Sequence, residues 1–391
     1  MDPNSPKVKT SLLLVSSLTI ASMITISASL PDMSAHFKDL PGGPSLVKLS
    51  LSLPALFIAL TATLAGAFID RAGRLKLLGA ALVLYAIAGS SGFWLNNIYG
   101  ILAGRALLGV SVGVSMTIVT TLVADYYQGK ARQQFAGLQI AVMSVAGILF
   151  ITLGGFMADI SWETPFLLYL FALAILPFAL RFLPEPESPV VTSDTPDTAV
   201  KAGTKSPPII WLVFLNVMLM WVLFFILPIQ IPFYLKDLGV EKNSLIGIAI
   251  AGSTLSSAIS SFNYSRLRGW FSHGIIFAIG YGLMALAFLV IAVGQTYGLI
   301  VIGLVVAGLG MGLLIPNSNI LVMQLAPPAV RGREIGKLTT FWFLGQFIAP
   351  IVLLPFINAY SQASVFSGIA LITGILCIFF FMSKKYWSPV A

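Results

Sequence analysis

The chain has 391 residues, of which 58% are hydrophobic and only 9% are charged, and its mean hydropathy is +0.95. A soluble domain carries about 25% charged residues, so this chain has too few polar side chains to cover a water-facing surface. The net charge of +8 does not indicate a nucleic-acid partner, because the Lys and Arg residues lie in short clusters between long apolar runs. We therefore expect a membrane protein that contacts the lipid bilayer and binds no nucleic acid.

Metal and cofactor chemistry finds no support in the sequence. Cys377 is the single cysteine, which excludes an intramolecular disulfide and a cysteine-based metal site. The histidines, His36 and His273, stand alone in loop-like stretches without ligand spacing. The glycine-containing segment 332–338 has the wrong spacing for a phosphate loop, and Leu338 replaces the required hydroxyl residue. We expect no metal, no cofactor and no enzymatic activity.

Long apolar segments follow one another along the whole chain. A helix needs roughly 20 apolar residues to cross the hydrocarbon core, and each spanning backbone must satisfy its own hydrogen bonds. By that criterion the sequence predicts twelve spanning helices, at about 11–31, 46–69, 75–94, 98–123, 135–158, 164–183, 209–233, 244–266, 271–293, 297–323, 335–357 and 361–382. The first of them superficially resembles a signal peptide, but equally apolar segments follow it, so we interpret it as the first span.

The distribution of basic residues predicts the orientation of these spans. An even number of spans places both termini on one side, which we take to be the cytoplasm. Of the 22 Lys and Arg residues, 17 then lie in cytoplasmic segments and one, Arg105, lies within a span. The opposite face holds only Lys38, Lys48, Lys236 and Lys242. This bias predicts a multi-pass protein of the cell (inner) membrane with both termini in the cytoplasm.

Residues 184–208 interrupt the apolar pattern. They are rich in Pro, Ser, Thr and charged residues, which predicts a flexible cytoplasmic linker. The linker separates six spans in residues 1–183 from six spans in residues 209–391. We therefore expect an amino-terminal six-helix bundle and a carboxyl-terminal six-helix bundle.

The two halves also match in sequence. Gly109 and Gly113 in the fourth span correspond to Gly308 and Gly312 in the tenth span, and the tripeptide Lys-Asp-Leu at 38–40 recurs at 236–238. Such matches in register indicate a duplication, which is how many secondary transporters are built. A pseudo-symmetric pair of bundles can rock about a central site and open it to each face in turn.

The segment from Gly66 to Leu78 lies between the second and third spans. Its residues Gly66, Asp70, Arg71, Gly73 and Arg74 match the pattern G-x-x-x-D-R-x-G-R. This pattern resembles the loop signature of the major facilitator superfamily. In the fourth span, Arg105 followed four residues later by Gly109 resembles a second signature of that superfamily, although Leu108 replaces its usual Gln.

The resemblance covers essentially the whole chain and is strongest to the twelve-helix drug and metabolite proton-antiporter branch. It implies an all-α membrane protein with twelve transmembrane helices in two pseudo-symmetric six-helix bundles, the major facilitator fold. It also implies a secondary transporter driven by an ion gradient. The expected partners are a small organic substrate and protons, and we expect a monomer.

The loop signature implies a conformational latch on the cytoplasmic side. Gly66 would allow close helix approach and Gly73 a tight turn, while Asp70 could face the positive end of a helix in the other half. Arg71 or Arg74 could pair with Asp125 at the end of the fourth span. The alternative is a basic anchor beside a carboxylate at a helix end.

Arg105 and Asp32 are candidates for proton coupling. Arg105 lies about 10 Å deep at 1.5 Å per residue, where an unpaired arginine is costly. Asp32 follows Pro31 near the outer end of the first span, so the two residues should occupy the same outer half of the amino-terminal bundle. A carboxylate whose arginine partner moves away can exchange a proton. Alternatively, Arg105 reaches the interface with its head group and Asp32 is a solvated helix-end residue.

The fifth span bears on the direction of transport. Exporters of the superfamily often carry G-x8-G-x3-G-P-x2-G-G, and this chain keeps Gly137, Gly154 and Gly155 at the two ends of that pattern. The central Gly-Pro is replaced by Phe150 and Ile151. Efflux of a drug, metabolite or siderophore is the first hypothesis, and uptake of a small organic nutrient with protons stays open.

The carboxyl-terminal half offers amide and aromatic side chains for a substrate. Pro316 and the two following asparagines are expected to interrupt the tenth span, and amides with aromatic rings suit a pocket for an amphipathic organic molecule. The candidate substrate-binding residues are Trp221, Gln230, Asn317, Asn319, Trp342 and Gln346. Ordinary helix packing is the alternative role for each of them.

Overall fold

The computed structural model describes residues 5–185 and 206–387, without the side chains of residues 63–72, 329 and 358. Twelve helices of the described chain are long and apolar enough to cross a membrane. They coincide with the twelve predicted spans to within several residues at their ends. The prediction of an all-α membrane protein with twelve transmembrane helices is therefore confirmed.

The helices fall into two groups along the chain. The first group contains α1 (Pro6–Ile24), η1 (Ser27–Ser29), α2 (Leu30–His36), α3 (Gly43–Ala72), α4 (Arg74–Gly89), α5 (Ser91–Trp94), α6 (Ile98–Tyr126), α7 (Gly129–Ala158), η2 (Thr164–Leu170) and α8 (Phe171–Phe182). The second group contains α9 (Ile209–Asp237), α10 (Asn243–Trp270), α11 (His273–Val293), α12 (Tyr297–Leu325), η3 (Pro328–Val330), α13 (Arg331–Ala359) and α14 (Gln362–Met382).

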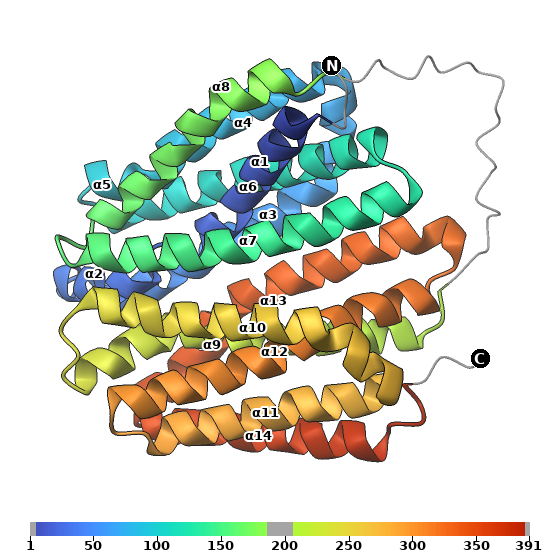
Figure 1. Cartoon of the computed structure of the whole chain (residues 1–391). Helices are drawn as coiled ribbons and strands as arrows, with labels where there is room; N and C mark the ends of the chain where they lie inside the picture. The colour runs from blue at the N-terminus through green and yellow to red at the C-terminus, as the bar shows by residue number, and fades with distance from the viewer. Residues whose placement is uncertain (1–4, 186–205, 388–391) are drawn as a thin grey trace.

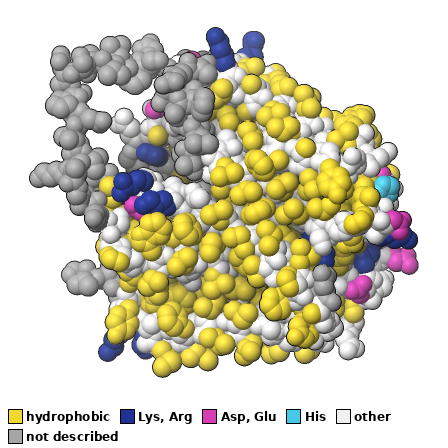
Figure 2. Space-filling view, turned by 180° about the vertical axis from the view of Figure 1, so that it is seen from behind, with side chains coloured by type: hydrophobic (Ala, Val, Ile, Leu, Met, Phe, Trp, Pro, Cys, Tyr) yellow, Lys and Arg dark blue, Asp and Glu magenta, His cyan; other side chains and the backbone are white. Residues whose placement is uncertain are grey.

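The two groups form an amino-terminal half and a carboxyl-terminal half that lie one above the other in Figure 1. The start of α1, the end of α8, the start of α9 and the end of α14 lie at one end of the molecule, which we call the linker end. The opposite end, where α2 lies, is called the far end. The surface between the two ends is largely apolar, and charged side chains gather towards the ends (Figure 2).

Each half has its own apolar core. The large core of the amino-terminal half also contains side chains from the other half, namely Val222, Phe225 and Ile229 of α9 and Phe343 and Ala349 of α13. One face of each of these two helices therefore packs against the amino-terminal half. A second contact joins α7 to α10, where the Cα atoms of Gly155 and Gly247 approach closely because neither residue has a side chain.

Two expectations about helix continuity are wrong. The tenth span is not interrupted, because α12 runs through Pro316. Proline removes a hydrogen bond to the carbonyl four residues earlier, and here the Ser261 hydroxyl donates to that carbonyl, of Gly312, at 2.7 Å. The first span, in contrast, is not a single helix. The turn of η1 separates α1 from α2, so Asp32 belongs to a short helix at the far end.

Candidate functional site

The far end holds the two halves together by polar contacts. The Asp32 carboxylate of α2 lies 3.3 Å from the Lys236 ammonium of α9 and accepts a hydrogen bond of 2.6 Å from the Asn243 amide at the start of α10. The Asn243 amide also donates to the Ala158 carbonyl of α7 at 2.9 Å. Asp32 and Lys236 keep 40% and 24% of their side chains exposed, so water screens this ion pair in part.

A second carboxylate, Asp159 after α7, caps the first turn of α10. It accepts hydrogen bonds from the backbone N–H groups of Asn243 at 2.6 Å and Ser244 at 3.2 Å. An anion at a helix N-terminus satisfies free N–H groups and interacts favourably with the helix dipole. We call Asp32, Asp159, Lys236 and Asn243 the far-end gate. It borders a surface hollow of about 680 Å³.

Contacts between the halves are concentrated on this side. In the described residues, the hydrogen bonds and ion pairs that join the halves are those of the gate, plus one from the Ser27 hydroxyl to the Pro228 carbonyl. Towards the linker end, Gly137 of α7 and Gly336 of α13 have open space where a Cβ would lie. The structure is therefore closed at the far end.

Asp32 and Arg105 are not partners, which corrects the expectation that they form a pair. The bend at η1 carries Asp32 to the interface between the halves, where Lys236 and Asn243 bind it. Arg105 is fully buried inside the amino-terminal half. It does not reach the membrane interface, so the alternative of an interfacial arginine is also wrong.

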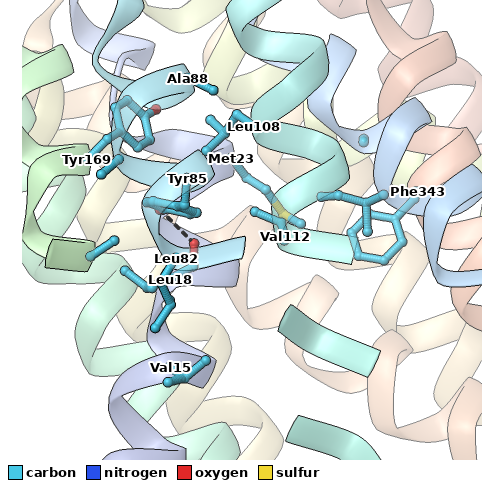
Figure 3. Close-up of a cluster of buried hydrophobic side chains, with 14 of the residues drawn as sticks. Val15, Leu18, Met23, Leu82, Tyr85, Ala88, Leu108, Val112, Tyr169 and Phe343 are labelled. Carbon is cyan, nitrogen blue, oxygen red and sulfur yellow. Dashed lines mark hydrogen bonds between the residues drawn. The ribbon is translucent and has the colours of Figure 1, made fainter. Parts of the chain in front are cut away.

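Neutral groups satisfy the Arg105 guanidinium. It donates to the Ser50 carbonyl at 2.8 Å, to the Ser22 carbonyl at 2.8 Å and to the Tyr169 hydroxyl at 2.7 Å. Among the described residues, no carboxylate lies within ion-pairing distance of it. Tyr169 lies beside Tyr85 in the surrounding apolar cluster (Figure 3), and the three bonds tie α6 to α1, α3 and η2. These neutral acceptors satisfy the guanidinium donors without neutralising its charge.

Four of the six candidate substrate residues carry buried polar atoms without a partner among the described residues. These atoms are Nε1 of Trp221 and of Trp342, both amide atoms of Gln230 and Oε1 of Gln346. Gln230 and Gln346 are each only 2% exposed. Buried polar groups are rarely left without hydrogen bonds outside functional sites. We call Trp221, Trp342 and Gln346 the aromatic–amide cluster. Gln230 lies nine residues, or two and a half turns, after Trp221 and therefore on the opposite side of α9.

Trp221 and Trp342 pack against the apolar core of the carboxyl-terminal half, at the contact between α9 and α13. The indole rings of Trp221 and Trp342 are 5.7 Å apart between centroids. Gln346 lies one helical turn from Phe343, which points towards Val112 of α6 in Figure 3. Trp221 lies about 18 Å from the linker end of α9, at 1.5 Å per residue, and is therefore near the middle of this helix of about 43 Å.

Asn317 does not belong to this cluster, which corrects that candidate. Its amide lies inside the carboxyl-terminal half, where its Oδ1 accepts from the Tyr264 hydroxyl at 3.0 Å and its Nδ2 donates to the His273 carbonyl at 3.0 Å. His273 is likewise no loop residue, because it begins α11, is buried, and contacts Asn317 and Gln324 through its ring nitrogens. Asn319 is half-buried.

The expected ion pair at the linker end is present between Arg74 and Asp125. It joins α4 to α6 inside the amino-terminal half, so it does not itself connect the two halves. Gly73 adopts the positive φ of 83° between α3 and α4, as a tight turn requires. The side chains of Asp70 and Arg71, and the surroundings of Gly66, lie outside the described residues.

Several residues of the site were not predicted from the sequence. Asp159 and Asn243 of the far-end gate look like ordinary polar caps, and Lys236 was noted only as part of the repeated Lys-Asp-Leu tripeptide. The interior contacts of Tyr169 and Lys48 were not predicted from the sequence either. For Lys48 the sequence does offer an indication, because a lysine inside an apolar span is unusual.

Known proteins resemble this chain over nearly its full length. The family model of the Major Facilitator Superfamily matches residues 12–245 and 232–389. The quinolone resistance protein NorA of Staphylococcus aureus is 25% identical over 366 residues, which cover 90% of this chain and 92% of that protein. The multi-drug resistance efflux pump PmrA of Streptococcus pneumoniae is 25% identical over 370 residues, which cover 91% of each chain.

The fold also matches solved transporters. The D-xylose–proton symporter superposes with a TM-score of 0.76 at 17% identity, covering 98% of each chain. At this identity the likeness concerns the fold alone. The twelve spans, the two halves and the match of the family model to most of the sequence lead to one conclusion: the chain belongs to the major facilitator superfamily and is a multi-pass membrane transporter, not an enzyme.

Proposed function

We propose that this transporter exports a small aromatic organic compound and takes up protons in exchange. The observation that carries the proposal is the aromatic–amide cluster, which combines two neighbouring indole rings with buried polar atoms that lack partners among the described residues. A bound molecule with a ring and polar groups would stack on Trp221 or Trp342 and hydrogen-bond to Gln346. The relatives named for quinolone resistance and multi-drug efflux support export.

Alternating access follows from where the contacts between the halves lie. We assign the linker end to the cytoplasm, because most basic side chains lie there. The far-end gate then closes the outer side, and substrate reaches the cluster from the cytoplasm. Opening of the gate separates Asp32 from Lys236 and Asn243 and exposes the cluster to the outside. We propose that the protein performs this cycle as a monomer.

Asp32 is the proposed proton-coupling residue, and Arg105 fixes the helices behind it. With the gate closed, the Asp32 carboxylate contacts Lys236 and the Asn243 amide. Opening of the gate removes both partners, which couples the surroundings of this carboxylate to the movement of the two halves.

Everted membrane vesicles test the direction and the coupling. With a quinolone as probe, addition of the compound to acid-inside vesicles should release protons and load the compound into the lumen. Vesicles without the protein supply the background. If neither a proton gradient nor a sodium gradient changes the flux of the compound, the coupled mechanism is wrong.

Asp32→Asn tests the coupling residue. This variant should keep quinolone binding but lose the dependence of flux on the proton gradient, because an amide cannot carry the proton. Asp39→Asn, at an exposed carboxylate of the same end, is the matched control and should behave as wild type. Gradient-driven flux that is equal in both variants would remove Asp32 from the mechanism.

Proton-coupled uptake is the second candidate function. It is favoured by α7, where Phe150 and Ile151 stand in place of the glycine and proline of the exporter pattern and are buried. The same vesicles separate the two directions. Uptake predicts that a proton gradient loads the compound into right-side-out vesicles and not into everted ones.

A further inference from the structure

Carboxylates are confined to the two ends of the molecule. Of the described acidic residues, those at the far end are Asp32, Asp39, Asp159, Glu163, Asp237 and Glu241. Those at the linker end are Asp125, Glu185 and Glu334. The remaining five of the 14 acidic residues fall in the sequence before α1, at the end of α3 and in the linker. A positively charged substrate at the aromatic–amide cluster would therefore meet no counter-charge.

Two basic side chains, in contrast, are buried between the ends. Arg105 is 0% exposed and Lys48 of α3 is 8% exposed. Among the described residues, the Lys48 ammonium has neither a hydrogen-bond acceptor nor a carboxylate at ion-pairing distance. Asp237 acts on it only from farther away, and the Asp237 carboxylate accepts a hydrogen bond of 2.6 Å from Gln362. The Lys48 side chain is largely buried without a counter-ion, and a ligand with a negative group would supply one.

Lys48 lies at the interface between the halves, in the second turn of α3 and near the far end. Its ammonium contacts the ring of Phe233 in α9, 4.7 Å from the ring centroid. Phe233 lies one helical turn from Gln230, and Lys236 of the far-end gate follows one turn later. Along α9, Gln230, Phe233 and Lys236 therefore follow one another at intervals of about one turn, with Lys48 beside Phe233 and Lys236 in the far-end gate.

We infer that the transported compound is an aromatic organic anion, a carboxylate or a related acid, whose negative group approaches Lys48 and whose ring lies beside Phe233. This inference rests on the proposed function and adds the substrate class to it. The amide of Gln230 can donate to the same negative group, and the buried Arg105 adds its positive field from the amino-terminal half. Export of an anion also moves negative charge outward, which an inside-negative membrane potential favours.

Three naphthalene compounds that differ in charge test whether the protein prefers an anionic ligand. 2-Naphthoate, the neutral 2-naphthamide and the cation 2-naphthylmethylammonium are offered to the purified full-length protein in nanodiscs, and binding is measured by equilibrium dialysis. We expect 2-naphthoate to bind at least tenfold more tightly than the cation, with the amide between them. Equal or tighter binding of the cation overturns the anion assignment, as does an absence of 2-naphthoate binding.

Lys48 variants test the residue. Lys48→Gln should weaken 2-naphthoate binding about tenfold or more and leave 2-naphthamide binding unchanged, while Lys48→Arg should retain the preference for the anion. Lys38→Gln, at an exposed lysine of the same end, is the matched control. Since Lys48→Gln could alter folding, unchanged amide binding shows that its site is intact. A Lys48→Gln protein that still prefers the anion tenfold overturns the role of Lys48.

Flux separates this inference from the proposed function. In proteoliposomes that contain wild-type protein, outward movement of 2-naphthoate should rise when the interior is made electrically negative. If the cation is exported under an ion gradient and 2-naphthoate is not, export stands and the anion assignment fails. If 2-naphthoate binds with the expected preference but is never moved outward, the anion site stands and the proposed export fails.

Discussion

The buried Arg105 stabilises the packing of the amino-terminal half through its hydrogen bonds, and it also brings a positive charge into the interior. Its three hydrogen bonds reach three different helical segments of the amino-terminal half. The planar guanidinium carries several N–H donors in a fixed fork, so it alone can donate at once to carbonyls and a hydroxyl that lie in different directions. A lysine at this position keeps the charge and loses the fork.

Arg105→Lys should therefore destabilise the protein by about 2–4 kcal/mol, the order expected for losing two charged hydrogen bonds. Tyr169→Phe removes the partner of one bond and should cost about 1–2 kcal/mol. Because the two changes remove a shared bond, the double variant should cost less than the sum of the single ones. Unfolding by SDS in mixed micelles measures these differences.

Tyr281→Phe is the control for this cycle. Tyr281 is equally buried and donates to the Asn216 amide at 2.7 Å, but it lies in the other half. Its combination with Arg105→Lys should be additive. Additivity of the Tyr169→Phe pair as well would show that the Arg105–Tyr169 bond contributes nothing measurable.

Residue identity in the sequence singles out side chains that are unusual for their surroundings. Trp221, Gln230, Trp342 and Gln346 were predicted from polar or aromatic character within apolar spans, and each has a buried polar atom without a partner among the described residues. Asn317 carried the same signal and lies elsewhere. Which face of a helix meets the other half depends on packing, and composition alone does not encode it.

At the scale of helices, α7 and α10 form the contact that decides whether the far end is closed. A Cβ on Gly155 would lie 2.7 Å from the Asn243 carbonyl oxygen and 3.2 Å from the Gly247 Cα. Backbone atoms cannot move aside as a flexible side chain can. The glycine is therefore required for the closed interface.

Gly155→Val should wedge these helices apart and shift the protein towards a state that is open at the far end. Overpacking typically costs 1–3 kcal/mol, which corresponds to about a tenfold change in the equilibrium between the two states. Labelling of a Ser244→Cys residue by an impermeant maleimide, in a Cys377→Ser background, reports this opening. We expect labelling to rise several-fold and transport to fall.

Gly137→Val is the matched control on the same helix, because a Cβ at Gly137 meets no atom within 4 Å. It should leave the labelling of Ser244→Cys unchanged. Equal labelling of the Gly155→Val and Gly137→Val proteins would mean that the α7–α10 contact does not control the far end.

At the scale of the whole molecule, the asymmetry of charge sets the orientation in the membrane. Basic clusters lie at the linker end, whereas acidic and basic residues are mixed at the far end. Positive residues are retained on the cytoplasmic side during insertion. The linker end should therefore face the cytoplasm.

Single cysteines in a Cys377→Ser background test this orientation. Lys38→Cys at the far end and Lys130→Cys at the linker end are both exposed positions. In intact cells an impermeant maleimide should label Lys38→Cys and spare Lys130→Cys, which should react after permeabilisation. The reverse pattern would invert the assigned topology and, with it, the direction of the proposed export.

The sequence by itself determined the class of protein, the number of spanning helices and the resemblance to a transporter superfamily. These properties follow from hydropathy, which is local along the chain, and from motifs of a few neighbouring residues. Only the tertiary structure decided that Asp32 pairs with Lys236 and Asn243, and that Lys48 is buried against Phe233. These partners are separated by about 200 residues in sequence, and the packing of one half against the other brings them together.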